Sequence, residues 1–77
     1  MKIRNLANIV ERDGNIFADV QVRQWQTYGF AWVTRPVFKW SYSPFWLFAD
    51  TGDFTPNRQV ELLYEVVKIN ALRENLK

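Results

Sequence analysis

The side chains that could carry chemistry in this chain are few, because its 77 residues include no histidine and no cysteine. The commonest general base, the commonest metal ligands and every thiol reaction are therefore missing. The hydroxyls of Ser41, Ser43 and Thr51 have no histidine to activate them as nucleophiles. Glu61 and Glu65 are one helical turn apart, a spacing typical of a solvated helix face. We therefore expect no enzymatic activity, no cofactor and no metal site.

One acidic triplet is an exception that needs its own explanation. Asp50-Thr51-Gly52 follows an apolar run and resembles the active-site triplet of retroviral-type aspartic proteases, where two such aspartates share a proton and activate water. That family continues with a long β-rich segment and a flap, whereas only 25 residues follow here, mostly in a predicted helix. A turn before a capped helix accounts for Asp50 and Gly52. Asp50 and Asp53 also lack the ligand spacing of a calcium loop.

Aromatic side chains are abundant instead, with four Trp, three Tyr and six Phe. Each ring can bury roughly 150–250 Å², so the chain is better equipped to bind than to catalyse. The segment after Gly14 alternates, and one of its faces carries aromatic and basic side chains. If the side chains of the next strand alternate as expected, basic residues of that strand lie on the same face. We predict a binding surface that consists of Phe17, Arg23, Trp25, Arg35 and Lys39.

Two functions fit such a surface. Trp, Tyr and Arg are the residues that most often anchor protein interfaces. Sheets with exposed aromatics and arginines also stack the unpaired bases of RNA or single-stranded DNA. Because the chain has ten basic against eight acidic residues, and Asp19 lies among the predicted cations, we favour a protein-binding module. A small inhibitor or adaptor that sequesters a protein target, such as phages encode, fits this description. Nucleic-acid binding is the alternative, and burial of this face by other parts of the chain is a third interpretation.

The elements that position the surface are expected to form a single α+β domain over residues 1–77. A small antiparallel meander of three to four strands should occupy residues 3–48 approximately. Two hairpin loops of three residues each are expected, one ending at Gly14 and one at Gly29, and the first would place Val10 opposite Ile16. In the second strand an apolar set alternates toward an inner face: Ile16, Ala18, Val20 and Val22.

The third strand of this sheet has two possible registers. Pro36 predicts a bend or an edge position. A three-residue loop before it would pair Trp25 with Ala31 and would turn four more aromatic residues to the inner face: Phe30, Trp32, Phe38 and Trp40. A two-residue loop would reverse both faces of the strand, because side chains alternate with a period of two.

A carboxy-terminal helix is predicted over residues 56–75, packed on one sheet face, with Thr55 as its cap and Pro56 in its first position. Its apolar residues cover more than half of the circumference: Val60, Leu62, Leu63, Tyr64, Val66, Val67, Ile69 and Ala71. One sheet face needs a stripe only somewhat wider than ~100°. The excess suggests a second subunit, so we expect a homodimer, with Trp32 and Val66 buried between sheet and helix.

The composition limits where such a chain works. It carries a formal charge of +2 and has no signal-peptide core, and its longest apolar run, Phe45–Ala49, is too short to cross a bilayer. We expect a complete small gene product that is cytoplasmic and does not bind membranes. A chain of 9.2 kDa buries only about 60–65% of its unfolded surface, which also favours a partner.

Overall fold

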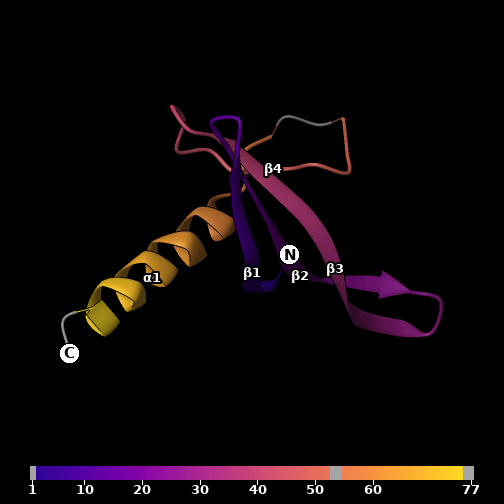
Figure 1. Cartoon of the computed structure of the whole chain (residues 1–77). Helices are drawn as coiled ribbons and strands as arrows, with labels where there is room; N and C mark the ends of the chain where they lie inside the picture. The colour runs from indigo at the N-terminus through magenta and orange to yellow at the C-terminus, as the bar shows by residue number, and fades with distance from the viewer. Residues whose placement is uncertain (1, 53–54, 76–77) are drawn as a thin grey trace.

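The computed structural model describes residues 2–52 and 55–75, and it confirms the predicted α+β fold. Four strands form an antiparallel sheet in chain order: β1 (Ile3–Arg12), β2 (Asn15–Gln26), β3 (Gly29–Trp40) and β4 (Leu47–Phe48). The helix α1 (Arg58–Asn75) follows. Figure 1 shows α1 and the β2–β3 hairpin extending from the middle of the molecule in different directions, so that the chain measures 45 × 28 × 18 Å. The expected turn residue Asp53 lies outside the described residues.

The first hairpin has a two-residue loop rather than the expected three-residue loop. Asp13 and Gly14 both have positive φ values, 53° and 80°, as a type I′ turn requires, and the Asp-Gly pair tolerates this. Arg12 consequently pairs with Asn15, and Val10 lies opposite Phe17. The predicted pairing of Val10 with Ile16 is therefore wrong.

Two irregularities in β1 then shift its register against β2. They lie between Arg4 and Ala7 and between Ala7 and Val10, and each contains an asparagine with positive φ, Asn5 at 58° and Asn8 at 55°. Asparagine is one of the few residues that adopt this conformation at low cost. Together the two β-bulges shift β1 by two residues against β2, so Ile3 lies opposite Val22 and the side chains keep their faces.

The second hairpin also has a two-residue loop, and this decides the faces of β3. Gln26 pairs with Gly29, and Trp25 pairs with Phe30 instead of Ala31. Every β3 side chain is thereby on the opposite face from the one that the three-residue loop predicts. The expectation that Phe30, Trp32, Phe38 and Trp40 face inward is wrong, and Val37, expected outside, is buried opposite Ala18.

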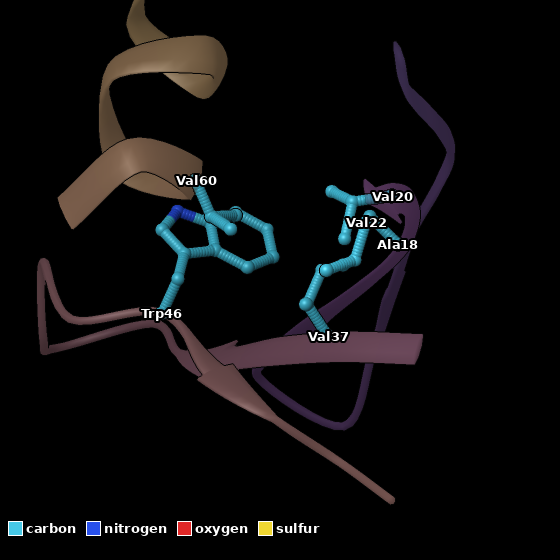
Figure 2. Close-up of a cluster of buried hydrophobic side chains, with 6 residues drawn as sticks. All are labelled: Ala18, Val20, Val22, Val37, Trp46 and Val60. Atoms are coloured by element: carbon cyan, nitrogen blue, oxygen red, sulfur yellow. The ribbon is translucent and has the colours of Figure 1, made fainter. Parts of the chain in front are cut away.

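The core is a small cluster between the sheet, the loop before β4 and the first turns of α1 (Figure 2). Its members are Ala18, Val20, Val22, Val37, Trp46 and Val60. The predicted inner face of β2 is thus confirmed, with Ile16 packed at the margin of the cluster. Trp46 is by far the largest of these side chains, and its ring packs edge-on against Tyr64 with centroids 5.1 Å apart. The indole of Trp46 therefore lies between helix and sheet, where it packs with Val60 and Tyr64 of α1.

The helix begins two residues later than predicted. Asn57 is its cap, because its side-chain oxygen accepts a hydrogen bond from the Val60 backbone N–H at 3.2 Å. Thr55 and Pro56 precede the helix, so their expected roles as cap and first position are wrong. The Asn57 backbone N–H also donates to the Trp46 carbonyl at 2.8 Å, which ties the start of the helix to the core.

Only the first half of α1 packs on the sheet. Val60 is fully buried, whereas every described residue after Val67 is exposed. Val66 is 53% exposed and Trp32 is 36% exposed, so the expectation that they meet between sheet and helix is wrong. At 100° per residue, Val66 lies nearly opposite the core-packed Tyr64. Trp32 lies on the face of the sheet opposite the helix, because the two-residue loop before β3 reverses the two faces of that strand.

This arrangement predicts different costs for the same substitution at two helix positions. Val60→Ala removes two buried methyl groups and should destabilise the fold by about 2 kcal/mol. In a domain of this size, that loss lowers the melting temperature by about 8–16 °C. Val66→Ala should leave it unchanged or slightly higher, because alanine has the better helix propensity. Thermal denaturation followed by circular dichroism measures both, and equal losses would contradict the placement of the core.

Candidate functional site

The face of the sheet opposite the core, here called the outer face, is the candidate site. Alternation along β2 and β3 places these residues on it: Phe17, Asp19, Gln21, Arg23, Trp25, Phe30, Trp32, Thr34, Pro36, Phe38 and Trp40. The helix packs on the core side, where Val60 joins the buried side chains of β2 and β3. Several large apolar side chains of the outer face are accordingly exposed: Phe17, Trp25, Phe30 and Trp32, with Val10 from β1.

The exposed aromatics gather where the β2–β3 hairpin turns. Trp25 is 69% and Phe30 60% exposed, and their rings meet edge-to-face with centroids 5.1 Å apart. The Arg23 guanidinium lies 4.9 Å from the centre of the Phe30 ring. Tyr28, in the turn itself, is fully exposed. We call this group of residues, together with Trp32, the hairpin patch: Arg23, Trp25, Tyr28, Phe30 and Trp32.

An arginine of β1 completes the edge of this patch. The Arg4 guanidinium carbon lies 3.8 Å from the centre of the Trp32 ring, and its Nε donates to the Gln21 side chain at 2.9 Å. Asn5 donates to the same Gln21 oxygen at 2.8 Å. Cation–π contacts of this kind hold both the arginine and the ring in place. The patch is therefore an ordered surface of rings and guanidinium groups.

A second aromatic row lies at the other end of the outer face and is more deeply packed. Phe17 stacks on Phe38 at 6.3 Å between ring centroids, Phe38 meets Trp40 at 5.4 Å, and Trp40 stacks on Tyr42 at 6.2 Å. Leu47 of β4 pairs with Phe38 and is only 3% exposed. Phe38 and Trp40 are half-buried, so this end of the face has chiefly a structural role.

Arg35 does not belong to the outer face, contrary to expectation. It lies opposite Val20 in the register and therefore on the core side. Its guanidinium makes two hydrogen bonds of 2.9 Å to the Asp50 carboxylate and lies 4.2 Å from the centre of the Phe48 ring. The side chain of Arg35 thus fastens the segment after β4 to the sheet.

Lys39 lies on the core side for the same reason. Its Nζ donates to the backbone carbonyls of Ser43 at 3.0 Å and Trp40 at 3.3 Å, so it holds the loop that follows β3. Of the five predicted site residues, the structure therefore brings together only Phe17, Arg23 and Trp25 on one face.

The residues that sequence reasoning missed are Arg4, the turn residue Tyr28, and the β3 residues Phe30 and Trp32. The two-residue loop before β3, which was considered as an alternative, would have placed both aromatics correctly. No comparable signal identified Arg4, because the bulges in β1 break the alternation on which such an assignment depends.

The Asp50 triplet acquires a structural role from its ion pair. The hydrogen bonds from Arg35, with a smaller contribution from its charge, lower the pKa of Asp50 in spite of partial desolvation. Asp50 is thus ionised and engaged by a bidentate partner. Among residues 2–52 and 55–75, no group of three or more Asp, Glu, His or Cys side chains is placed to hold a metal ion.

Charge is distributed unevenly around the hairpin patch. Residues 20–49 contain Arg23, Arg35 and Lys39 but not a single Asp or Glu. Arg35 is neutralised by Asp50, which leaves Arg23 as the cation of the patch, with Arg4 and Lys2 beside it. The patch is therefore aromatic and basic, and the nearest acidic residue on the outer face of β2 is Asp19.

A hollow of about 340 Å³ lies on the other side of the molecule, between α1 and the loop that follows β3. It is lined by aromatic rings, two Glu and two Lys: Tyr42, Trp46, Tyr64, Glu61, Glu65, Lys39 and Lys68. The buried Trp46 Nε1–H has no acceptor within the described part of the chain. Lys68 is already paired with Glu65 at 3.0 Å, and Lys39 with two carbonyls, so little of this polar lining is available to a ligand.

Comparison with known proteins assigns this chain to no group: no protein-family model, curated protein or solved structure matches it. Within the described residues, the structure also contains no helix with the length and apolar character needed to cross a bilayer. The function must therefore be argued from the outer face itself.

The Arg35–Asp50 ion pair predicts a pH dependence of stability. Because the folded pKa of Asp50 is lowered, its stabilisation is complete above the unfolded value of about 4 and is lost as pH falls through the folded pKa. Asp50→Asn should cost roughly 1 kcal/mol near pH 7, allowing for the solvent exposure of the carboxylate. Urea unfolding should show this difference shrinking as pH falls below about 4, and a constant difference between parent and variant would contradict the assignment.

Proposed function

We propose that this chain is a non-enzymatic protein-binding module that docks on its target through the hairpin patch. The observation that carries the proposal is the pair formed by Trp25 and Phe30, which are more than half exposed yet held in a fixed edge-to-face geometry. Rings that are ordered before binding lose little conformational freedom on docking, and Trp and Arg dominate interface energetics. Arg23 adds a cation to the same surface.

The total surface of the chain supports a binding role. The accessible area is 5706 Å². A compact monomer of this mass would expose about 4,900 Å². The excess comes from the elongated shape, with the hairpin and the end of α1 both extending outward (Figure 1). A partner that covers one of these extensions would recover part of the missing burial.

The geometry favours a protein over a nucleic acid as the target. Stacking of bases needs free ring faces, and here Arg4 lies over Trp32 and Arg23 over Phe30. With Arg35 and Lys39 on the core side, the described cations near the patch are Arg4, Arg23 and Lys2, whose backbone carbonyl accepts from the Arg23 N–H, and Asp19 lies on the same face. A small cytoplasmic inhibitor or adaptor that sequesters its target is the role we propose, with single-stranded nucleic acid as the alternative ligand.

We also propose that the chain forms a weak homodimer through α1. Four apolar side chains on the side away from the core are about half exposed or more: Leu62, Val66, Ile69 and Leu72. The first half of the helix carries Glu61 and Glu65 with Arg58, and the second half carries Lys68 and Arg73 with Glu74, so the halves have net charges of −1 and +1. An antiparallel pair of helices would place acidic halves beside basic halves. The area that four such side chains can bury is well below the roughly 800 Å² per partner of a standard interface, so the dimer should be weak.

Substitution of Trp25 tests the docking surface. Trp25→Ala should weaken capture of the target from the native host by roughly thirtyfold or more, as expected for an interface anchor. Phe45→Ala is the matched control, because Phe45 is an exposed aromatic outside the patch and its loss should leave capture intact. Equal effects of both variants in a quantitative pull-down would contradict the proposed surface.

The nucleic-acid alternative predicts a different result. Fluorescence anisotropy with a labelled single-stranded RNA should show micromolar binding, lost in Trp25→Ala, with a log–log salt slope of about −2 for three phosphate contacts. We expect no such binding at physiological salt. Its observation would overturn the protein-binding proposal.

The dimer has a separate test. Light scattering at a concentration of about 100 µM should give a mass above that of the 9.2 kDa monomer. Ile69→Glu should restore the monomer, whereas Ala71→Glu, which adds the same charge on the other side of the helix, should not. A monomeric parent chain at this concentration would disprove the dimer.

A further inference from the structure

One side of β3 has no neighbouring strand over most of its length. β2 pairs with β3 along its whole extent, from Trp40 to Gly29. β4 pairs only with Val37 and Phe38 on the other side. Within the described residues, positions 29–35 therefore form a regular strand with one open edge. This edge borders the hairpin patch.

The backbone groups that this edge presents can be identified from one hydrogen bond. The Ala49 N–H donates to the Pro36 carbonyl at 3.0 Å, so the Pro36 carbonyl points away from β2. In an antiparallel strand every second residue directs its backbone groups to the same side. Phe30, Trp32 and Thr34 therefore each present one N–H donor and one carbonyl acceptor to the open edge. Pro36 also belongs to the residues whose backbone groups point away from β2. Because proline lacks only an outward N–H at this position, no hydrogen bond to β2 is lost.

The other edge of the sheet, formed by β1, is protected against pairing with a further strand. β1 carries two β-bulges, and its Asn5 and Asn8 side chains bond to Gln21 and Asp19 of β2. Bulges of this kind prevent an edge strand from pairing with another chain. The register of β2 with β3 has no such irregularity. The fold thus blunts one edge and leaves the other regular.

Charge indicates which kind of strand fits the open edge. Residues 20–49, which include the whole open segment, contain no acidic side chain, and Arg23 lies over Phe30 beside it. A second copy of β3 would add no acidic side chain from this segment to pair with Arg23. An acidic segment would instead meet opposite charge. The occupant that the edge favours is therefore an acidic strand from a different protein.

We propose that β3 accepts an extended acidic segment of the partner protein as an additional strand, paired with Phe30, Trp32 and Thr34. This inference rests on the proposed protein-binding function and names the mode of binding. Main-chain hydrogen bonds supply affinity in strand addition, and alternate side chains supply specificity. Alternate apolar side chains of the added strand would lie on the outer face beside Phe30 and Trp32. A hollow of about 360 Å³ at the hairpin turn, lined by residues 26–31, adjoins the end of this strand.

The test selects peptides from a displayed library of random dodecapeptides against the full chain. The selected peptides should alternate apolar with acidic residues. Thr34→Pro removes only an outward N–H and should weaken binding of a selected peptide roughly tenfold. Thr34→Ala is the matched control, since it keeps that N–H and should bind as the parent does. In the parent, hydrogen exchange should slow at the amides of Phe30, Trp32 and Thr34 when the peptide is added.

The outcomes separate this inference from the proposed function. Equal binding by Thr34→Pro and the parent, with loss in Trp25→Ala, would overturn strand addition and leave the hairpin patch as a protein-binding surface. Selection of basic peptides, or of none, would also overturn it. If Thr34→Pro is not folded by circular dichroism, the exchange measurement on the parent decides, and unchanged exchange at the three amides contradicts the proposal.

Discussion

The register between β2 and β3 is the constraint on which the rest of the structure depends. The two-residue loop of Thr27 and Tyr28 sets it, and side chains alternate with a period of two. This parity places Val37 against Ala18 in the core and brings Arg35 within reach of Asp50. The same parity leaves the rings of β3 on the outer face. Core, loop anchoring and candidate site thus follow from one turn.

The sequence was informative where local chemistry and packing agree. The alternation of Ala18, Val20 and Val22 identified the inner face of β2, and the apolar periodicity after residue 56 identified the helix. The sequence was insufficient where one additional residue in a loop or strand changes which side chains share a face. Asp13-Gly14 fits loops of two or three residues, and the bulges at Asn5 and Asn8 have no marker apart from the asparagines themselves. Arg35 and Lys39 were wrongly assigned to the predicted site because the predicted faces of β3 depended on the length of the loop before it.

The core itself is thin, and this shapes the role of the loop between β3 and α1. Most of its buried side chains are valines, and a single indole, that of Trp46, fills the space between sheet and helix. Lys39 and Arg35 hold the two ends of the loop that carries this indole. The polar contacts of Lys39 and Arg35 at the margin of the core therefore position the Trp46 side chain, which joins the sheet to the helix. The hairpin patch, on the opposite face, is independent of this joint.

The unequal edges of the sheet also govern how far any assembly through strands can grow. A sheet with two regular edges can accept a neighbour on each side, and repeated addition then produces an open-ended ribbon of the kind found in fibrils. In this chain the bulged β1 offers no regular edge, and β4 covers only two residues of β3. A strand added at β3 therefore cannot be matched by a second addition at the β1 edge of the same sheet. Copies of this chain consequently lack the two regular edges that an open-ended ribbon of the whole sheet requires.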